Sequence, residues 1–243
     1  MHIQKLLPLA AASLFLSSAA AFAGAPAMGD WSGFYVGAEG GAQFSSTHFN
    51  LPGDTSDVLQ QTSKDKTSLV GGGLAGYNFQ TGNTVFGIEA DASSGGGTSS
   101  VTACNATDGC FVTTHDSFTT LNHLKDNWSG RVRARLGFAD GATLFYAAAG
   151  YSYADSKLSL IGLCYTFSDP SVPTIYNFNR SQGLSGFNIG GGVERALGEH
   201  FVARVEYVYD DFGSTTYPGG AEWNNRRISS NNGAVRVAVA YHF

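Results

Sequence analysis

Apolar and polar residues alternate with a period of two along most of the chain. The last nine residues show the pattern clearly, with Val235, Val237, Val239, Tyr241 and Phe243 alternating with Arg236, Ala238, Ala240 and His242. A period of two predicts a β-strand with one apolar face and one mixed face. Free chain ends seldom carry such a pattern. We therefore expect the C-terminus to be a strand that is built into a sheet.

The same alternation predicts seven earlier strands, which makes eight in all. They cover residues 31–44, 67–79, 84–94, 127–139, 143–155, 183–196 and 200–212. Glycine and alanine blur the register of the strands at 67–79 and 143–155. Each of the seven is long enough for a tilted strand to cross a bilayer, which takes about 9–11 residues.

The connections between these strands alternate in length. Three are short, at residues 80–83, 140–142 and 197–199, and four are long, at residues 45–66, 95–126, 156–182 and 213–232. Short turns at one end and long loops at the other are typical of bacterial outer-membrane barrels, with the turns in the periplasm. Since the expected strand number is even, both termini are expected in the periplasm.

The N-terminal segment indicates export. Residues 1–23 contain Lys5, an apolar run over 6–16 and the small-residue site Ala21-Phe22-Ala23. This is the pattern of a secretory signal peptide that is cut after Ala23. Residues 24–243 contain no run of 18 or more apolar residues, as a helical span would need. An exported chain without helical spans can cross a membrane only as a closed barrel. We therefore expect an all-β fold, an eight-stranded antiparallel transmembrane barrel, over residues 24–243.

Composition agrees with this class. The chain has 32 glycines and is 13% aromatic but only 14% charged, against about 25% charged residues in soluble domains. A net charge of −5 argues against a nucleic-acid partner. Neither metal-ligand spacing nor a cofactor motif is apparent, so we expect no cofactor.

If the apolar face points to lipid, charged side chains fill the interior. The inward carboxylates are expected to be Glu39, Glu89, Asp91, Glu194 and Glu206, and the inward guanidinium groups those of Arg131, Arg133, Arg135, Arg204 and Arg236. An eight-stranded barrel is about wide enough to be filled by its own side chains. One interpretation is therefore a salt-bridged plug that stabilises the barrel. The other is a narrow, anion-selective pore lined by the arginines of the 127–139 strand.

The chain has three cysteines, an odd number, so they cannot all pair with one another. Cys104 and Cys110 are close enough in sequence to form a loop disulfide in an oxidising compartment, while Cys164 has no obvious partner. The alternative is that Cys104 and Cys110 form no disulfide with each other.

Several segments carry a family resemblance. The opening Trp31-Ser32-Gly33-Phe34-Tyr35-Val36-Gly37 resembles the start of alphaproteobacterial outer-membrane surface-antigen barrels, within the OmpA-like and opacity-type group. Further similar segments are residues 86–91, 131–138, 191–194 and 205–209 and the terminal strand.

This resemblance implies an outer-membrane protein with a structural and surface-display role. Its partners would be outer-membrane lipid and lipopolysaccharide, and host or phage molecules that bind the loops. Tyr241 and Phe243 resemble the C-terminal signal that the outer-membrane assembly machinery reads.

Two other functions are weighed against surface display. The first is a small porin that passes solutes or ions through the charged lumen. The second is a lipid-modifying enzyme, for which the local sequence His115-Asp116-Ser117 offers a base, a carboxylate and a hydroxyl. Neighbours in sequence do not form a triad by adjacency alone, so we expect no enzyme. His48 and His123 fall in expected loops, where a histidine is usually solvated.

Overall fold

The computed structural model describes residues 30–50, 63–95, 98–104, 118–166, 169–217 and 226–243. Its regular structure is entirely β. The strands are β1 (Gly33–Asn50), β2 (Ser63–Thr81), β3 (Thr84–Ser94), β4 (Thr98–Cys104), β5 (Phe118–Asp140), β6 (Thr143–Thr166), β7 (Asp169–Ala196), β8 (Phe201–Tyr217) and β9 (Arg226–His242). In the part of the chain that is described, no helix has the length and hydropathy to cross a membrane.

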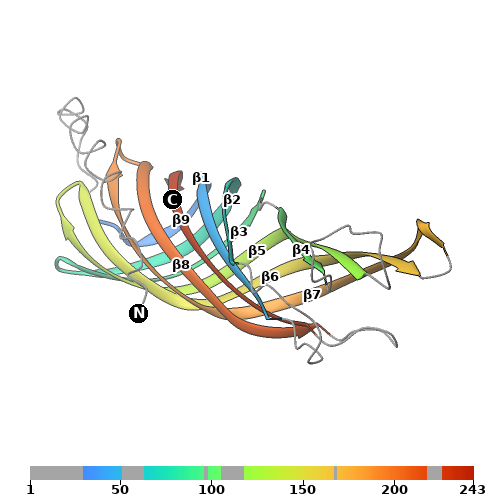
Figure 1. The fold of residues 1–243 in the computed structure, drawn as a ribbon. Coiled ribbons are helices and arrows are strands. Elements are labelled where there is room, and N and C mark those ends of the chain that lie inside the picture. Colours follow the sequence, from blue (N-terminus) through green and yellow to red (C-terminus); the bar gives the residue numbers. More distant parts are fainter. Residues whose placement is uncertain (1–29, 51–62, 96–97, 105–117, 167–168, 218–225) are drawn as a thin grey trace.

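The strands form a closed antiparallel barrel (Figure 1). Strands that are consecutive in sequence pair with each other, except β3 and β4, and β1 pairs with β9 from Tyr35↔His242 to Asn50↔Arg227. Both β3 and β4 pair with β5, so they share one position in the ring. The ring therefore has eight positions, and the predicted eight-stranded barrel is confirmed.

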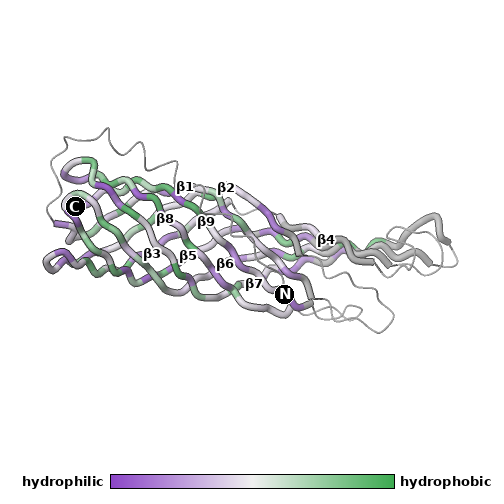
Figure 2. Tube along the Cα trace, turned by 60° about the vertical axis from the view of Figure 1, so that its left-hand side comes forward, coloured by the Kyte–Doolittle hydropathy of each residue, from purple (hydrophilic) through white to green (hydrophobic). Residues whose placement is uncertain are grey.

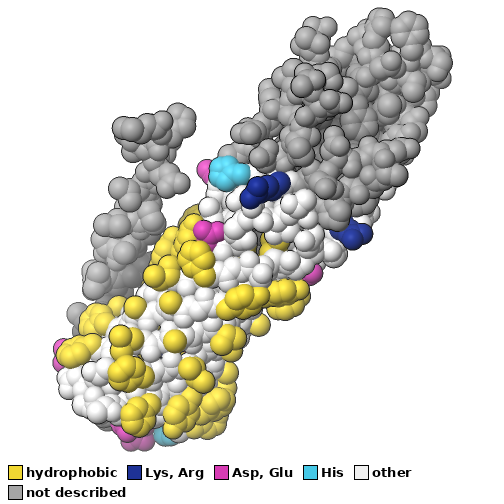
Figure 3. All heavy atoms as spheres, turned by 90° about the horizontal axis from the view of Figure 1, so that it is seen from below, with side chains coloured by type: hydrophobic (Ala, Val, Ile, Leu, Met, Phe, Trp, Pro, Cys, Tyr) yellow, Lys and Arg dark blue, Asp and Glu magenta, His cyan; other side chains and the backbone are white. Residues whose placement is uncertain are grey.

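The barrel is apolar on the outside. Along β3, Phe86 and Ile88 are 51% and 66% exposed, while Glu89 and Asp91, whose side chains point to the other face, are buried. Figure 3 shows hydrophobic side chains spread over the outer wall. In water this arrangement would be unfavourable, but it suits a barrel that is surrounded by lipid.

All four expected loops are partly strand, and two of them contain long stretches of pairing. Residues 156–182 were expected to be a loop, but β6 and β7 continue their pairing from Lys157↔Ser181 to Cys164↔Thr174. Within the expected loop 95–126, β4 pairs with the extended start of β5. A strand needs an apolar outer face only inside the bilayer. Beyond the bilayer, backbone hydrogen bonds are enough to continue a hairpin. Such extensions therefore show no alternation of apolar and polar residues by which the sequence could predict them. For the same reason His48 and His123 lie in β1 and β5, not in loops.

The interior is layered along the barrel axis. At the short-turn end a buried apolar cluster contains Trp31, Val85, Ala139, Leu144, Ala196 and Val202. We call it the turn-end cluster. Toward the long-connection end a second one, the loop-end cluster, contains Leu124, Ala154, Leu158, Leu184, Phe212 and Ile228. Charged side chains lie between the two. In Figure 2 the C-terminus marks the short-turn end, and β4 lies toward the other.

Gly76 makes room for the buried ring of Tyr35. A Cβ at Gly76 would lie 2.3 Å from the Tyr35 Oη and 2.4 Å from its Cζ. Tyr35 is fully buried and its position is fixed by bonds to charged neighbours, so the ring cannot easily move aside.

We predict that Gly76→Ala lowers barrel stability by about 1–3 kcal/mol, as overpacking of a tight interior does. The measurement is the urea midpoint of unfolding, followed by tryptophan fluorescence in detergent micelles. Gly71→Ala on the same strand is the control, because its added Cβ would lie 3.7 Å from the carbonyl oxygen of Glu39, an ordinary contact distance. Equal midpoints for the two variants would contradict the assigned packing.

Candidate functional site: the charged interior of the barrel

Three arginines of β5 form the centre of the site. Arg131, Arg133 and Arg135 are two residues apart, so in a strand they share one face, about 7 Å apart. That face is the interior, because all three side chains are buried while Val132 and Leu136 are exposed.

Arg131 holds the layer nearest the loop-end cluster. Its Nε and Nη2 donate to Oδ1 and Oδ2 of Asp210 at 2.8 and 2.7 Å, in a bidentate arrangement. Its Nη1 donates to Asp91 Oδ1 at 2.7 Å. The Ser152 hydroxyl also donates to Asp210, at 2.6 Å. β5 is thereby joined to β3, β6 and β8.

Arg133 lies in the middle layer between two glutamates. Its Nη1 donates to Glu206 Oε1 at 2.7 Å, and its Nη2 donates to Glu89 Oε1 at 2.5 Å. The Tyr146 hydroxyl donates to the same Glu206 oxygen at 2.9 Å. Both carboxylates are thus held from more than one side.

Arg135 and Arg204 share their carboxylates. Both donate to Glu194 Oε1, at 2.5 and 2.7 Å, and Arg204 also reaches Glu89 Oε2 at 2.6 Å. The Tyr35 hydroxyl donates to that Glu89 oxygen at 2.7 Å. The guanidinium carbon of Arg135 lies 4.0 Å from the ring centroid of Tyr146, a cation–π contact.

Arg236 connects the chain ends to this network. It donates to Glu39 Oε1 at 2.5 Å and to Asp91 Oδ1 at 3.1 Å. Because Glu39 lies on β1 and Arg236 on β9, their bond crosses the pair of strands that closes the ring.

The structure brings all ten residues of the expected interior set into one buried network. It adds Asp210, which has no exposed surface and makes six carboxylates against five guanidinium groups. Asp210 has the same parity as Arg204 and Glu206 on its strand, so the alternation could have identified it. Tyr35, Tyr146 and Ser152 also belong to the network, and only their hydrogen bonds reveal it.

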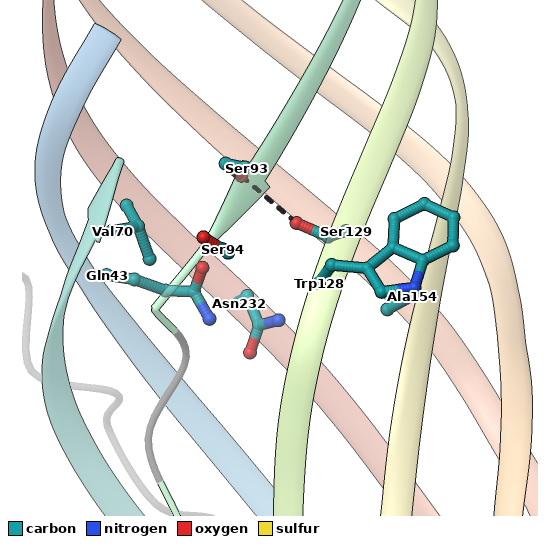
Figure 4. A pocket seen from close by; sticks show the side chains of 8 residues that line it. All are labelled: Gln43, Val70, Ser93, Ser94, Trp128, Ser129, Ala154 and Asn232. Atoms are coloured by element: carbon teal, nitrogen blue, oxygen red, sulfur yellow. Dashed lines mark hydrogen bonds between the residues drawn. The ribbon is translucent and has the colours of Figure 1, made fainter. Parts of the chain in front are cut away.

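A small cavity is present in the described interior. A cavity of about 10 Å³ lies beside the end of β3, lined by Gln43, Val70, Ser93, Ser94, Trp128, Ser129, Ala154 and Asn232 (Figure 4). This volume suits about one water molecule. The hydroxyls of Ser93 and Ser129 lie 3.2 Å apart beside it. In the described part of the chain, no group of three or more histidine, cysteine or acidic residues could hold a metal ion.

The expected assembly-signal residues lie at the short-turn end. The Phe243 ring is 5.6 Å from that of Phe34 and 5.1 Å from that of Tyr241. Tyr241 also contacts Phe201 at 5.4 Å, edge to face. These aromatic side chains join β1, β8 and β9 at the place where the ring closes.

Some expected sites lie outside the described residues. Cys104 ends β4, but its side chain and the whole of Cys110 fall outside them. The sequence His115-Asp116-Ser117 also falls outside.

The chain is similar to known outer membrane proteins. The family model described as outer membrane protein beta-barrel domain matches residues 9–243. A 22 kDa outer membrane protein of Rhizobium leguminosarum is 27% identical, over 88% of this chain and 79% of that protein. A 31 kDa outer-membrane immunogenic protein of Brucella melitensis is 28% identical, over 88% of this chain and 84% of that protein. The crystal structure of OprG from Pseudomonas aeruginosa superposes with a TM-score of 0.49 and 13% identity, covering 89% of this chain and 98% of that one.

We predict that Arg133→Met lowers the free energy of unfolding by about 3–5 kcal/mol, because it leaves buried carboxylates without their charge partner. Urea titration of the folded barrel in micelles measures this loss. Arg195→Met is the control, since Arg195 is exposed on the outer wall and bonds only to Thr143 in the described structure.

A second substitution, Glu206→Gln, should recover part of the loss in the Arg133→Met background, because it removes one of the stranded charges. If Arg133→Met behaved like Arg195→Met, the network would not be a source of stability.

Proposed function

This chain belongs to the outer membrane protein β-barrel domain family, and from that premise we propose that it is a closed, non-conducting barrel that serves the envelope as a structural and surface-display protein. The observation that carries the proposal is the filled interior. Five arginines and six carboxylates span the lumen in one hydrogen-bonded network. The two apolar clusters lie at either end of it.

The packing of the interior argues against the porin alternative. A conducting path needs water along its whole length, but in the described lumen the paired charges fill the space between two buried apolar clusters. The three arginines of β5 do not leave an uncompensated positive charge in the lumen either, because each of them forms an ion pair with at least one carboxylate. The charges that suggested anion selectivity are engaged in holding strands together.

The relatives are outer membrane proteins, and the 31 kDa protein of Brucella melitensis is named as immunogenic. If the interior of the barrel neither conducts nor binds, molecules in the surrounding water can contact the protein only at the two ends of the barrel. We place the long connections outside the cell and the short turns and both termini in the periplasm, as the lengths of the connections favour. Host or phage molecules would then meet the long connections.

The chain ends fit the same proposal. Residues 1–23 would direct export and be removed. The aromatic residues Tyr241 and Phe243 would be read by the assembly machinery before β9 closes against β1. Enzymatic activity is not part of the proposal, because in the described interior every arginine of the network is paired with carboxylates.

We predict that the folded protein gives no discrete current steps in a planar bilayer. A trimeric porin from the same detergent, added to the same bilayer, shows that insertion is detected. Folding is verified beforehand by the difference in gel mobility between boiled and unboiled samples. Reproducible steps from folded protein, altered by Arg131→Ala or Arg135→Ala, would favour the porin instead.

We also predict the orientation. An epitope inserted between Gly219 and Gly220, in the β8–β9 connection, should be labelled by antibody on intact cells. The same epitope inserted between Gly82 and Asn83, in the β2–β3 turn, should be labelled only after the outer membrane is opened. The reverse labelling would overturn the proposed orientation.

A further inference from the structure

Two lysines lie directly opposite each other on the outer wall. Lys125 of β5 pairs with Lys157 of β6, and both side chains are exposed. Like charges at directly opposite positions repel and destabilise a sheet. Neither ammonium group forms an ion pair with a carboxylate of the described residues. The fold thus carries a local electrostatic cost at this position, and an anion would relieve it.

The lysine pair lies just beyond the apolar band of the wall. On β5 the outward side chains run from Phe138 through Leu136 and Val132 to Trp128, all exposed. With a rise of about 3.3 Å per residue and a tilt near 40°, this span covers roughly 25 Å, the usual height of the lipid-facing band. The ring of Trp128 lies 5.4 Å from that of Tyr153 on β6. Such aromatic side chains mark the boundary between lipid tails and headgroups.

Lys125 is three residues beyond Trp128, and Lys157 is four beyond Tyr153. That distance is about 10 Å or less along the barrel, so the ammonium groups reach the headgroup layer. Figure 3 shows that basic side chains on the visible face lie outside the part of the wall where hydrophobic side chains gather.

The surroundings of the pair are rich in hydrogen-bonding groups. His123 lies on the same face as Lys125, and its Nδ1 is 2.8 Å from the Ser100 hydroxyl. Ser181, opposite Lys157 on β7, is exposed. The carboxylate of Asp155, two residues before Lys157 on the same strand, accepts a hydrogen bond from the Asn127 amide at 2.8 Å.

We propose that Lys125 and Lys157 form a binding site for the phosphate of an outer-leaflet glycolipid of the lipid A type. The two ammonium groups would bind the phosphate, and the Trp128–Tyr153 pair would contact the lipid below it. Basic residues at the headgroup level are the usual means of binding phosphorylated lipids. The choice of the outer leaflet rests on the proposed orientation, with the long connections outside the cell.

The opposite wall lacks this arrangement. There Arg227 of β9 pairs with Thr216, and its guanidinium donates to the Ser214 hydroxyl at 2.9 and 2.6 Å. It carries the same charge at the same end of the barrel but has no basic residue opposite it. Arg227→Gln is therefore a matched control for charge removal.

The test is lipid binding to the full folded protein in micelles, measured by native mass spectrometry. The probes are diphosphoryl lipid A, its dephosphorylated form, phosphatidylglycerol and phosphatidylcholine. We expect the Kd for diphosphoryl lipid A to rise about tenfold in the Lys125→Gln/Lys157→Gln variant, as the loss of charge-assisted phosphate contacts implies. Lys125→Arg/Lys157→Arg and Arg227→Gln should bind it as the wild type does, and dephosphorylated lipid A should bind weakly to all of them.

Equal binding of diphosphoryl lipid A by the double glutamine variant and the wild type would overturn the site. Lysine-dependent binding of phosphatidylglycerol without binding of lipid A would overturn the assignment to an outer-leaflet glycolipid. Micelle binding does not depend on orientation in the cell. The epitope and conductance measurements test the proposed function. If they agree with it but lipid A binding does not depend on the two lysines, only the lipid-binding inference is contradicted.

Discussion

Charges that are removed from water must be paired, and this requirement governs the interior of the barrel. Each arginine of the network contacts one carboxylate or more, and Glu89 alone receives bonds from Arg133, Arg135 and Arg204. Since these partners come from different strands, the pairing also fixes strand register. A slip of one residue would turn every charged side chain of a strand toward lipid. Electrostatic pairing inside and apolar contact outside therefore select the same alignment.

The sequence predicted the fold because the period of two is a direct consequence of strand geometry. Inside the bilayer, the outer face of a strand must be apolar and the inner face must fit a packed lumen. Phe86, which is exposed, and Glu89, which is buried, follow these two requirements. Beyond the bilayer those requirements end. The extended hairpin of β6 and β7 is held by backbone bonds, so its sequence gives no clear alternation. This is why the eight strands of the ring were predictable, whereas β4 and the strand ends were not.

The interior set was predictable from parity, but its partners were not. Parity places Arg131 and Asp210 in the lumen, whereas their bidentate contact depends on the stagger between β5 and β8, which are not neighbours in the ring. The buried role of Tyr35 depends likewise on a glycine on the neighbouring strand. Lys125 and Lys157 lie opposite each other because a bulge between Asp126 and Trp128 shifts the register of β5 against β6. The sequence pattern does not predict this bulge, so it could not predict the lysine pair.

The pairing of β1 with β9 also bears on how the chain folds. Glu39 and Arg236 meet across 197 positions of sequence, so the last contact needed for closure has one of the largest separations in the chain. High contact order slows folding, and until closure both terminal strands present open edges that can pair with other chains. Such a polypeptide depends on protection from aggregation during its passage to the membrane. The kinetics of ring closure, more than the final stability, would then limit how much folded protein a cell obtains.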